Sequence, residues 1–232
     1  MADNYLERRM EDLRSGRVNS SGSAGIGGGV KATRKGMVSF PMPEKRVLII
    51  DTSTDGPGLA IAESFSRTGC RTALFHNKEM NPVQGIRCYP IADAAAGSGI
   101  SDAFRNLLKA WRDIDVLIPV DPEHADLSEL LGIWAAHKEA FPIPSEYGVR
   151  IIPVECIVGA PEDAGPVFDA LPTGLSRFGA TVNRVRYVKR TADRDEGIAG
   201  SEATSEGLTR SLIFLSLPSS RHITHSTLNI GV

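Results

Sequence analysis

The sequence predicts an α/β fold: a doubly wound parallel β-sheet with helices on both faces, in three layers. From residue 45 onward, short apolar runs alternate with amphipathic segments of helical periodicity, which is typical of βαβ units. The apolar runs are continuous, as in Arg46–Asp51, and this indicates strands that are buried on both faces. Apolar residues make up 41% of the 232 residues, which is enough for a full hydrophobic core.

Each predicted element follows from this alternation. The predicted strands are residues 46–51, 71–75, 86–89, 114–119, 149–154, 180–188 and 227–230. The predicted helices are residues 59–68, 101–111, 126–140 and 205–217. Gly69 is expected to end the first helix, and Ser101 to cap the second.

The first 44 residues differ from the rest and are predicted to form a separate arm, so that a single domain spans residues 45–232. Residues 3–15 have helical spacing of Leu6, Met10 and Leu13, and a Gly-rich linker and basic residues follow. A short helix on a flexible tether cannot bury its apolar stripe alone. We therefore expect these three residues to contact another subunit of a homo- or hetero-oligomer; docking on the chain's own domain and binding of another partner remain alternatives.

Charge and cysteine content restrict the class of protein. The net charge is −2 and the pI about 6.2, so the chain lacks the basic excess of a nucleic-acid-binding protein. No apolar run reaches the roughly 20 residues of a membrane span. Cys70, Cys88 and Cys156 are far apart in the sequence and have no metal-ligand spacing, which favours reduced thiols and a cytoplasmic protein.

Three segments resemble the short-chain dehydrogenase/reductase (SDR) family. RVLIIDTSTDGPGLAIA at residues 46–62 matches the family's opening strand and its T-G-x-x-x-G-I-G turn. GVRIIPVECIVG at residues 148–159 matches its fifth strand, and SLIFLSLPSSRHITHSTLNI at residues 211–230 matches its closing pattern. The resemblance implies a Rossmann-like fold over residues 45–232, an NAD(P) cofactor and catalysis by Ser, Tyr and Lys.

The cofactor motif departs from the family pattern. Gly56 and Gly58 keep the last two glycines of the turn, but Thr52 replaces the first, and acids stand at Asp51 and Asp55. Carboxylates at this place oppose a diphosphate. At the end of the second strand the family's acid, which binds the adenosine ribose, is replaced by His76. The turn is therefore either a distorted nucleotide site or a mere strand-to-helix connection.

If a cofactor binds, the candidate binding residues by this resemblance are Thr52, Asp55, Gly56, Gly58 and His76. Lys78 beside His76 would accommodate a 2′-phosphate.

The catalytic motif is absent. The family's Ser position is Cys156, no Tyr-x-x-x-Lys occurs anywhere in the sequence, and the P-G after the sixth strand is Tyr187-Val188. The segment between Val158 and Asn183 is also too short for the family's fifth helix, and its prolines interrupt a helix. No catalytic residue is therefore carried over.

Some residues suggest a nucleophile or a metal site, but each also has a simpler structural role. Cys156 with His124 or His137 would form a nucleophile pair, but a buried, inert cysteine is more common. His222 and His225 are too few for a metal site. The four acids that follow predicted strands are weak candidates for Mg²⁺, since such acids more often cap helices: Asp51, Asp55, Asp93 and Asp121. No metal is predicted.

These observations predict a pseudoenzyme: a structural or regulatory protein with an SDR-like fold that has lost its cofactor and catalytic motifs and binds no cofactor. The alternative is an NAD(P)-dependent oxidoreductase with non-standard residues, in which Cys156 or Tyr187 transfers the proton. A third hypothesis is that the acids and Cys156 serve a different small ligand. The sequence identifies neither a substrate nor a partner.

Overall fold

The computed structural model describes residues 32–34, 37–38, 42, 44–53, 56–77, 80–91, 98–121, 127–142, 148–158, 175–189 and 199–230. The chain divides into two compact units, residues 1–38 and 39–232. In the first, β1 (Ala32–Arg34) pairs antiparallel with β2 (Met37–Val38), a pairing that the sequence did not predict. The expected helix at residues 3–15, with Leu6, Met10 and Leu13, lies outside the described residues.

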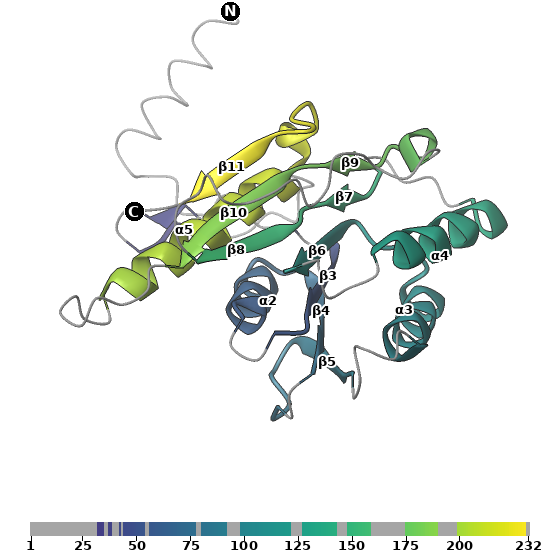
Figure 1. Ribbon diagram of the computed structural model, residues 1–232, viewed down its shortest axis with the longest axis horizontal. Helices are drawn as coiled ribbons and strands as arrows, with labels where there is room; N and C mark the ends of the chain where they lie inside the picture. Colours follow the sequence, from purple (N-terminus) through teal and green to yellow (C-terminus); the bar gives the residue numbers. More distant parts are fainter. Residues whose placement is uncertain are drawn as a thin grey trace, which may run out of the picture. The chain divides into compact units, whose positions relative to one another are not determined.

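The second unit contains a parallel sheet in the order β11-β10-β8-β6-β3-β4-β5 (Figure 1). Its strands are β3 (Arg46–Asp51), β4 (Arg71–His76), β5 (Ile86–Pro90), β6 (Val116–Val120), β8 (Val154–Val158), β10 (Arg184–Lys189) and β11 (Thr227–Ile230). Two short strands, β7 (Arg150–Ile151) and β9 (Thr181–Val182), extend the sheet beside β6. The helices are α2 (Gly58–Arg67), α3 (Ser98–Trp111), α4 (Leu127–Ala140) and α5 (Ala199–Ser216), with short 3-10 turns η4 (Leu175–Phe178) and η5 (Pro218–Ser220).

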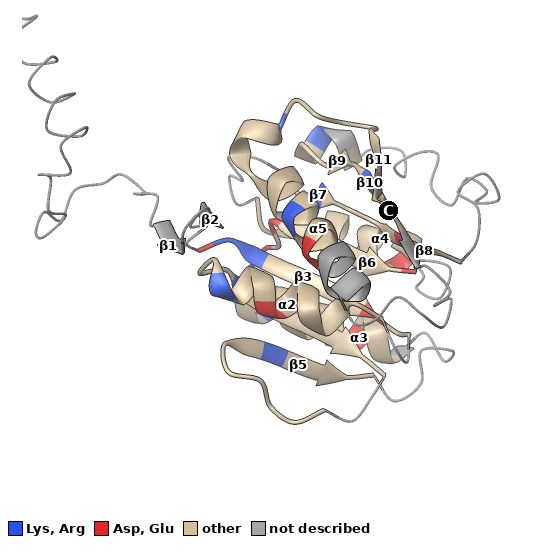
Figure 2. Cartoon of the chain, turned by 90° about the vertical axis from the view of Figure 1, so that its left-hand side faces the viewer, with Lys and Arg blue, Asp and Glu red and all other residues tan. Residues whose placement is uncertain are grey.

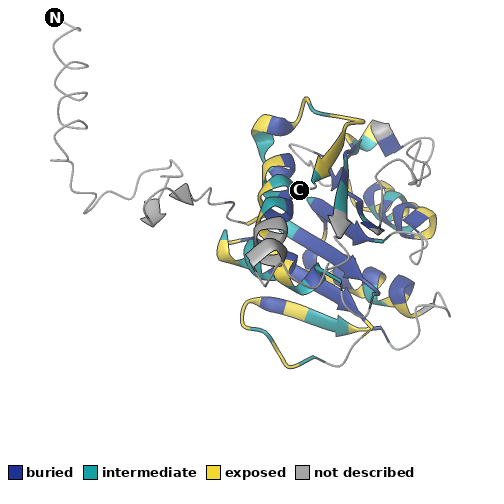
Figure 3. Cartoon of the chain, turned by 60° about the vertical axis from the view of Figure 1, so that its left-hand side comes forward, coloured by how far each residue is buried: buried dark blue, intermediate teal, exposed yellow. Residues whose placement is uncertain are grey.

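Helices cover both faces of this sheet. The side chains of α2 and α5 share one apolar cluster with one face of the strands, and those of α3 and α4 share a second cluster with the other face (Figure 1). In Figure 3 the central strands are dark blue, whereas the edge strand β5 is partly exposed. The predicted doubly wound α/β fold is therefore confirmed.

Strand β3 shows why the prediction succeeds. Its four apolar residues, Val47 to Ile50, are at most 1% exposed, as expected for a strand with a helical layer on each side. Helix α2 follows with Ile61, Ala62 and Phe65 on its buried stripe. It ends before Gly69, whose φ of +89° is left-handed and favours glycine.

Two predicted helix starts are wrong. Helix α3 begins at Ser98 rather than at Ser101, and Ser101 lies within the helix, where its hydroxyl donates to Glu129 Oε1 at 2.6 Å. Helix α5 begins at Ala199, before the predicted residue 205. Its first turns contain Gly, Ser and Thr and lack the apolar repeat on which the prediction depended.

Two predicted strands are each divided in the structure. The strand at 149–154 becomes β7 and β8, separated by Ile152 and Pro153; proline has no N–H for the ladder. The strand at 180–188 becomes β9 and β10, separated by Asn183. The amide of Asn183 donates to Ile151 O at 3.0 Å and its side chain to Ile223 O at 2.8 Å, so the break is stabilised.

Buried charges lie where the strands begin. Asp113, which is 1% exposed, accepts hydrogen bonds from Lys138 Nζ at 2.7 Å and Trp134 Nε1 at 3.2 Å. The start of β3 is blue in Figure 2, the colour of Lys and Arg. Arg46, the first residue of this strand, donates from Nε to Asp115 Oδ2 at 2.9 Å. The contacts of Asp113 attach α4 before the start of β6, and the pair of Arg46 and Asp115 joins the amino ends of β3 and β6. Both lie away from the ends where ligands bind in such folds.

No helix in the described part of the chain is long and apolar enough to cross a membrane.

Candidate functional site

The topology places a site at the carboxyl ends of the strands. From β3 the chain proceeds to β4 and β5 on one side, whereas β6, β8, β10 and β11 follow on the other. Ligands of open α/β sheets bind where the strand order reverses in this way. The candidate site residues are therefore those at or near the carboxyl ends of β3, β4, β6, β8 and β10.

Asp51 occupies the turn after β3. Its side chain is buried, its Oδ2 accepts the amide N–H of Gly58 at 2.7 Å, and its Oδ1 accepts that of Ser53 at 3.0 Å. Gly58 is the first residue of α2, and no side chain of the adjacent N-cap residue Pro57 caps this helix. A carboxylate of the chain itself therefore takes the place at the helix N-terminus where an anionic ligand would be stabilised.

The two glycines of the turn make room for this carboxylate. A Cβ atom added at Gly56 would lie 2.2 Å from Asp51 Oδ2, and one added at Gly58 would lie 2.4 Å from Asp51 Cβ. Both distances are too short for any side chain, so glycine is required at both positions. The described part of the turn thus packs around Asp51; Asp55 lies outside the described residues.

The ends of β3 and β4 are joined by a side chain that the sequence analysis missed. Asn77 Nδ2 donates to Thr52 O, and Thr52 is buried. Asn77 directly follows the candidate residue His76, but Asn77 itself belongs to no motif noted in the sequence. The predicted residues Thr52 and His76 therefore lie on adjoining strand ends, as the resemblance implied.

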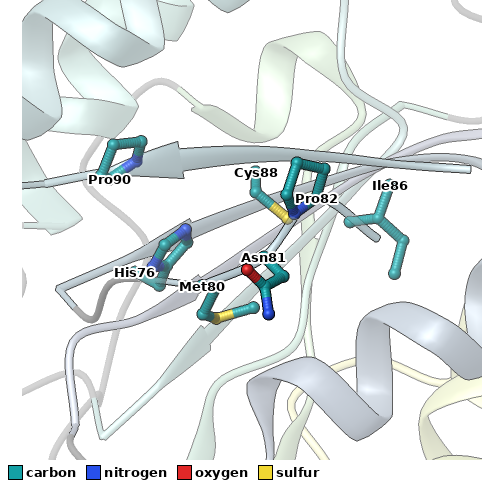
Figure 4. Close-up of a pocket in the computed structure, with 7 residues that line it drawn as sticks. All are labelled: His76, Met80, Asn81, Pro82, Ile86, Cys88 and Pro90. Carbon is teal, nitrogen blue, oxygen red and sulfur yellow. The ribbon is translucent and has the colours of Figure 1, made fainter. Parts of the chain in front are cut away.

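His76 lines a cavity of about 570 Å³ (Figure 4). The imidazole is 5% exposed, and neither ring nitrogen has a hydrogen-bond partner among the described residues. Residues 80–82 and strand β5 form the rest of the wall. The sequence signal for this cavity was the short connection between two predicted strands, which has no helical periodicity.

Asp121 connects the ends of β6 and β8. Its amide donates to Val154 O at 2.8 Å, and its Oδ1 accepts the amide N–H of Cys156 at 2.8 Å. Its φ of +47° is unusual for a residue other than glycine. Asp121 thus fixes the backbone at Cys156, the residue at the family's Ser position.

Cys156 and Tyr187 lie side by side. They are directly paired in the register of β8 and β10, and residues paired in this way present their side chains on the same face of a sheet. Burial raises the pKa of Tyr187, and the neighbouring Cys156 raises it further. The two residues named as alternative proton carriers are therefore neighbours.

The opposite face of the same strands carries an ion cluster. Glu155 is buried, and its carboxylate pairs with Arg184 Nε at 2.9 Å and Arg186 Nε at 3.0 Å. Two arginines thus share one carboxylate. This cluster was not predicted, because Glu155 is distant in sequence from the two arginines.

Of the two histidines considered as partners of Cys156, only His137 is described; His124 lies outside the described residues. His137 Nε2 hydrogen-bonds Arg112 O at 2.8 Å, before the start of β6, whereas Cys156 lies within β8. His222 is exposed and contacts Arg221 Nε at 3.1 Å. His225 is exposed too, and its amide donates to Val182 O.

The described residues form no recognisable metal site. Among these, no group of three or more His, Cys, Asp or Glu side chains is arranged to hold a metal ion. Asp55 and Asp93, two of the four acids considered from the sequence, lie outside the described residues.

Solved structures share this fold. No family model and no curated protein matches the chain. An aldohexose dehydrogenase of Thermoplasma acidophilum, solved as a C-terminal deletion mutant, is 13% identical with a TM-score of 0.52 and covers 81% of this chain and 95% of its own. The structure of gox2181 is 14% identical to this chain, with a TM-score of 0.58, and the match covers 81% of this chain and 94% of gox2181. A hydroxysteroid dehydrogenase of Escherichia coli is 11% identical, with a TM-score of 0.56, and the match covers 81% of this chain and 95% of that protein.

These likenesses establish the class of fold. The chain has an SDR-like Rossmann fold, and the resemblance seen in the sequence is confirmed at this level. The expectation of no cofactor is contradicted, because two of these structures are dehydrogenases by name, and dehydrogenases transfer hydride through a nicotinamide or flavin cofactor. The expectation followed from the altered motifs alone, whereas the fold that binds such cofactors is intact.

Proposed function

We propose that the chain is an NAD(P)-dependent oxidoreductase with non-standard site residues. The observation that carries the proposal is the pairing of Tyr187 with Cys156 in the adjacent strands β10 and β8, each two residues before the last residue of its strand, in a fold shared with dehydrogenases. The carboxyl ends of the strands are where such folds bind ligands. Both side chains exchange protons, which is the function that the missing Tyr-x-x-x-Lys motif would perform.

The described residues fit the nucleoside of the cofactor better than its diphosphate. At the end of β4, the unpartnered imidazole of His76 and its cavity fit a nucleoside. At α2, the amide of Gly58 already donates to Asp51, so a diphosphate meets a competing carboxylate. Thr52, Asp55, Gly56, Gly58 and His76 remain the residues proposed to hold the cofactor, which supplies a hydride when bound.

The chain's own contribution is proton transfer. A tyrosine hydroxyl is protonated at neutral pH and would donate from Oη to the oxygen of a carbonyl substrate; the raised pKa of Tyr187 makes it a weaker acid than an ordinary tyrosine. The resulting phenolate regains a proton from water. No lysine follows four residues later to lower that pKa, so we expect slower turnover than with a complete Tyr-Lys pair.

A non-catalytic, dinucleotide-binding subunit is the second candidate. The sequence contains no Tyr-x-x-x-Lys, and Tyr187 is half-buried against the cluster formed with α2 and α5. In this case the fold would bind the cofactor, and the complex would act through a partner. Both candidate functions include dinucleotide binding, and only the oxidoreductase would convert a substrate.

Thermal unfolding with each of NAD⁺, NADH, NADP⁺ and NADPH tests the binding step. A ligand at 100 times its dissociation constant adds about 2.7 kcal/mol to the stability. Loss of NADPH absorbance with a panel of aldehydes and ketones then tests turnover, with Tyr187→Phe and Cys156→Ala as variants and His222→Phe as control. Binding without turnover selects the second candidate; no binding by any dinucleotide refutes both.

Location and assembly are part of the proposal. Among the described residues, Cys70, Cys88 and Cys156 form no disulfide, which is typical of a reducing compartment such as the cytoplasm. We propose that the arm with Leu6, Met10 and Leu13 contributes to an oligomer. Deletion of residues 1–30 should lower the mass in solution, and an unchanged mass would refute this role.

A further inference from the structure

A fully buried arginine at the amino ends of the strands has no role in the proposed function. Arg150 begins β7 and is 1% exposed. Its Nε, Nη1 and Nη2 atoms have no hydrogen-bond partner among the described residues. A guanidinium remains charged in proteins, and a buried charge is costly unless it is paired. Arg150 therefore requires a counter-charge that the described residues do not supply.

Strand register places a second unpartnered group beside this guanidinium. Thr181 of β9 lies directly opposite Arg150 of β7, and residues paired in this way present their side chains on the same face of a sheet. The Thr181 hydroxyl is buried, and it too has no hydrogen-bond partner within the described part of the chain. Buried polar side chains are almost always hydrogen-bonded, and each exception requires an explanation. Here two exceptions are neighbours, and both are donors that lack an acceptor.

Both side chains lie on the face of the sheet that α2 and α5 cover. Val116 is opposite Arg150 in β6 and belongs to the cluster formed with these helices, whereas the next residue, Ile151, belongs to the cluster of α3 and α4. Among the described strands, β9 pairs with β7 alone (Figure 1), and Thr181 as a whole is only partly buried. The two groups therefore lie at a margin of the sheet, at the end opposite the proposed dinucleotide site.

The charges around Arg150 do not neutralise it. Asp115 accepts the amide of Arg150 at its main-chain oxygen at 2.9 Å, but its carboxylate pairs with Arg46. Burial lowers the pKa of Arg150, and no carboxylate in the ranges that the structure describes opposes this effect. Lys45 is a second cation: burial lowers its pKa, Asp115 raises it, and Arg150 lowers it again. An anion beside Arg150 would therefore be held in a positive potential.

We propose that Arg150 and Thr181 together bind a small oxyanion, which the chain takes up as it folds. The planar guanidinium offers two parallel N–H donors to one oxyanion, and the Thr181 hydroxyl offers a third donor. The anion is small because Arg150 is almost wholly enclosed. A short carboxylate, such as formate, and inorganic phosphate share this chemistry. The inference does not rest on the proposed function, because it requires neither a dinucleotide nor a reaction.

Urea unfolding detects such an anion, because a ligand that binds only the folded chain stabilises it by mass action. The full-length chain is first unfolded and refolded in Tris chloride, which releases any anion that it retained. Formate, acetate or phosphate then replaces chloride at constant ionic strength. Above the dissociation constant, each tenfold rise in oxyanion concentration should raise the folding equilibrium constant tenfold. The anion that produces this slope at the lowest concentration identifies the source as a carboxylate or as phosphate.

Three variants locate the effect. Arg150→Met removes the charge and the donors but keeps a long apolar side chain, so its stability should not depend on oxyanions and should not fall in chloride alone. Arg105→Met, at an exposed arginine, is the matched control and should respond as the wild type does. Thr181→Val keeps the shape but removes the hydroxyl, and we expect the dissociation constant to rise about tenfold. Should Arg150→Met fail to fold, the comparison of Thr181→Val with the wild type decides.

Three outcomes overturn the inference. The first is a wild-type stability that no oxyanion raises above its value in chloride. The second is an equal response of Arg150→Met and Arg105→Met, which would be a general effect of salt. The third is Thr181→Val binding the oxyanion as tightly as the wild type. None of these outcomes affects dinucleotide binding, so the two proposals fail independently.

Discussion

Asp51 Oδ2 accepts the backbone N–H of Gly58 at 2.7 Å, across the turn that connects β3 to α2. The carboxylate thus serves as a cap from outside the helix, where Pro57 provides no side-chain cap. Its negative charge also lies at the positive end of the helix dipole. The same amide would be a donor to a cofactor diphosphate, so fold stability and cofactor binding depend on one group.

Replacement of Asp51 should therefore have opposite effects on stability and on binding. Asp51→Asn removes the charge and leaves one acceptor, and we expect the free energy of unfolding to fall by about 1–2 kcal/mol. Affinity for NAD(P)(H) should rise, because a diphosphate no longer meets a carboxylate at α2. Urea unfolding and calorimetric titration measure the two effects, with the exposed Asp102→Asn as control. Weaker dinucleotide binding by Asp51→Asn would contradict the competition.

The buried Asp113 should be far more important for stability than its exposed counterparts. Asp113→Ala leaves the ammonium of Lys138, at 2.7 Å in the wild type, buried without its carboxylate, and such losses cost about 3–5 kcal/mol. Adding Lys138→Met removes this buried charge as well and should restore part of the stability. Asp102→Ala, which breaks the exposed pair with Arg105, should stay within about 0.5 kcal/mol. Equal effects of Asp113→Ala and Asp102→Ala in urea unfolding would contradict this assignment.

The fold was predictable because its strands are buried on both faces. Strands β3 and β11 have the predicted boundaries, and the sheet is parallel and doubly wound as predicted. The break between β7 and β8 was not predictable from periodicity, since Pro153 lies within a continuous apolar run. The early start of α5 was missed because Ala199 to Thr204 have no apolar repeat.

The site was predictable in its position but not in its contacts. The resemblance located the turn after β3 and the residue at the end of β4. It did not show that Asp51 fills its own turn, because that depends on the side-chain direction of a single residue. Nor did it show that Tyr187 lies beside Cys156, because the register of strands distant in sequence is set by the packing of the whole sheet.

Two glycines provide a matched test of backbone constraint. Gly148 has a φ of +66°, and a Cβ there would lie 2.0 Å from Gly179 O, so Gly148→Ala should lower the unfolding free energy by more than about 2 kcal/mol. Gly132 lies exposed in α4, with no atom within 4 Å of an added Cβ. Gly132→Ala should therefore raise stability by about 0.5–1 kcal/mol. Urea unfolding measures both, and a stable Gly148→Ala would contradict the close approach of the two backbones.

Ionisation of Tyr187 should occur at unusually high pH. Burial and, secondly, Cys156 raise its pKa above the ordinary value of 10.0. The stability that Tyr187 contributes is therefore fully present below pH 10.0 and is lost as the pH rises toward the pKa of the folded state. The ultraviolet titration of wild type minus Tyr187→Phe isolates this residue, and Cys156→Ala should lower its pKa in part. A Tyr187 that ionises at or below its ordinary pKa would show that it is neither buried as described nor held protonated for proton donation.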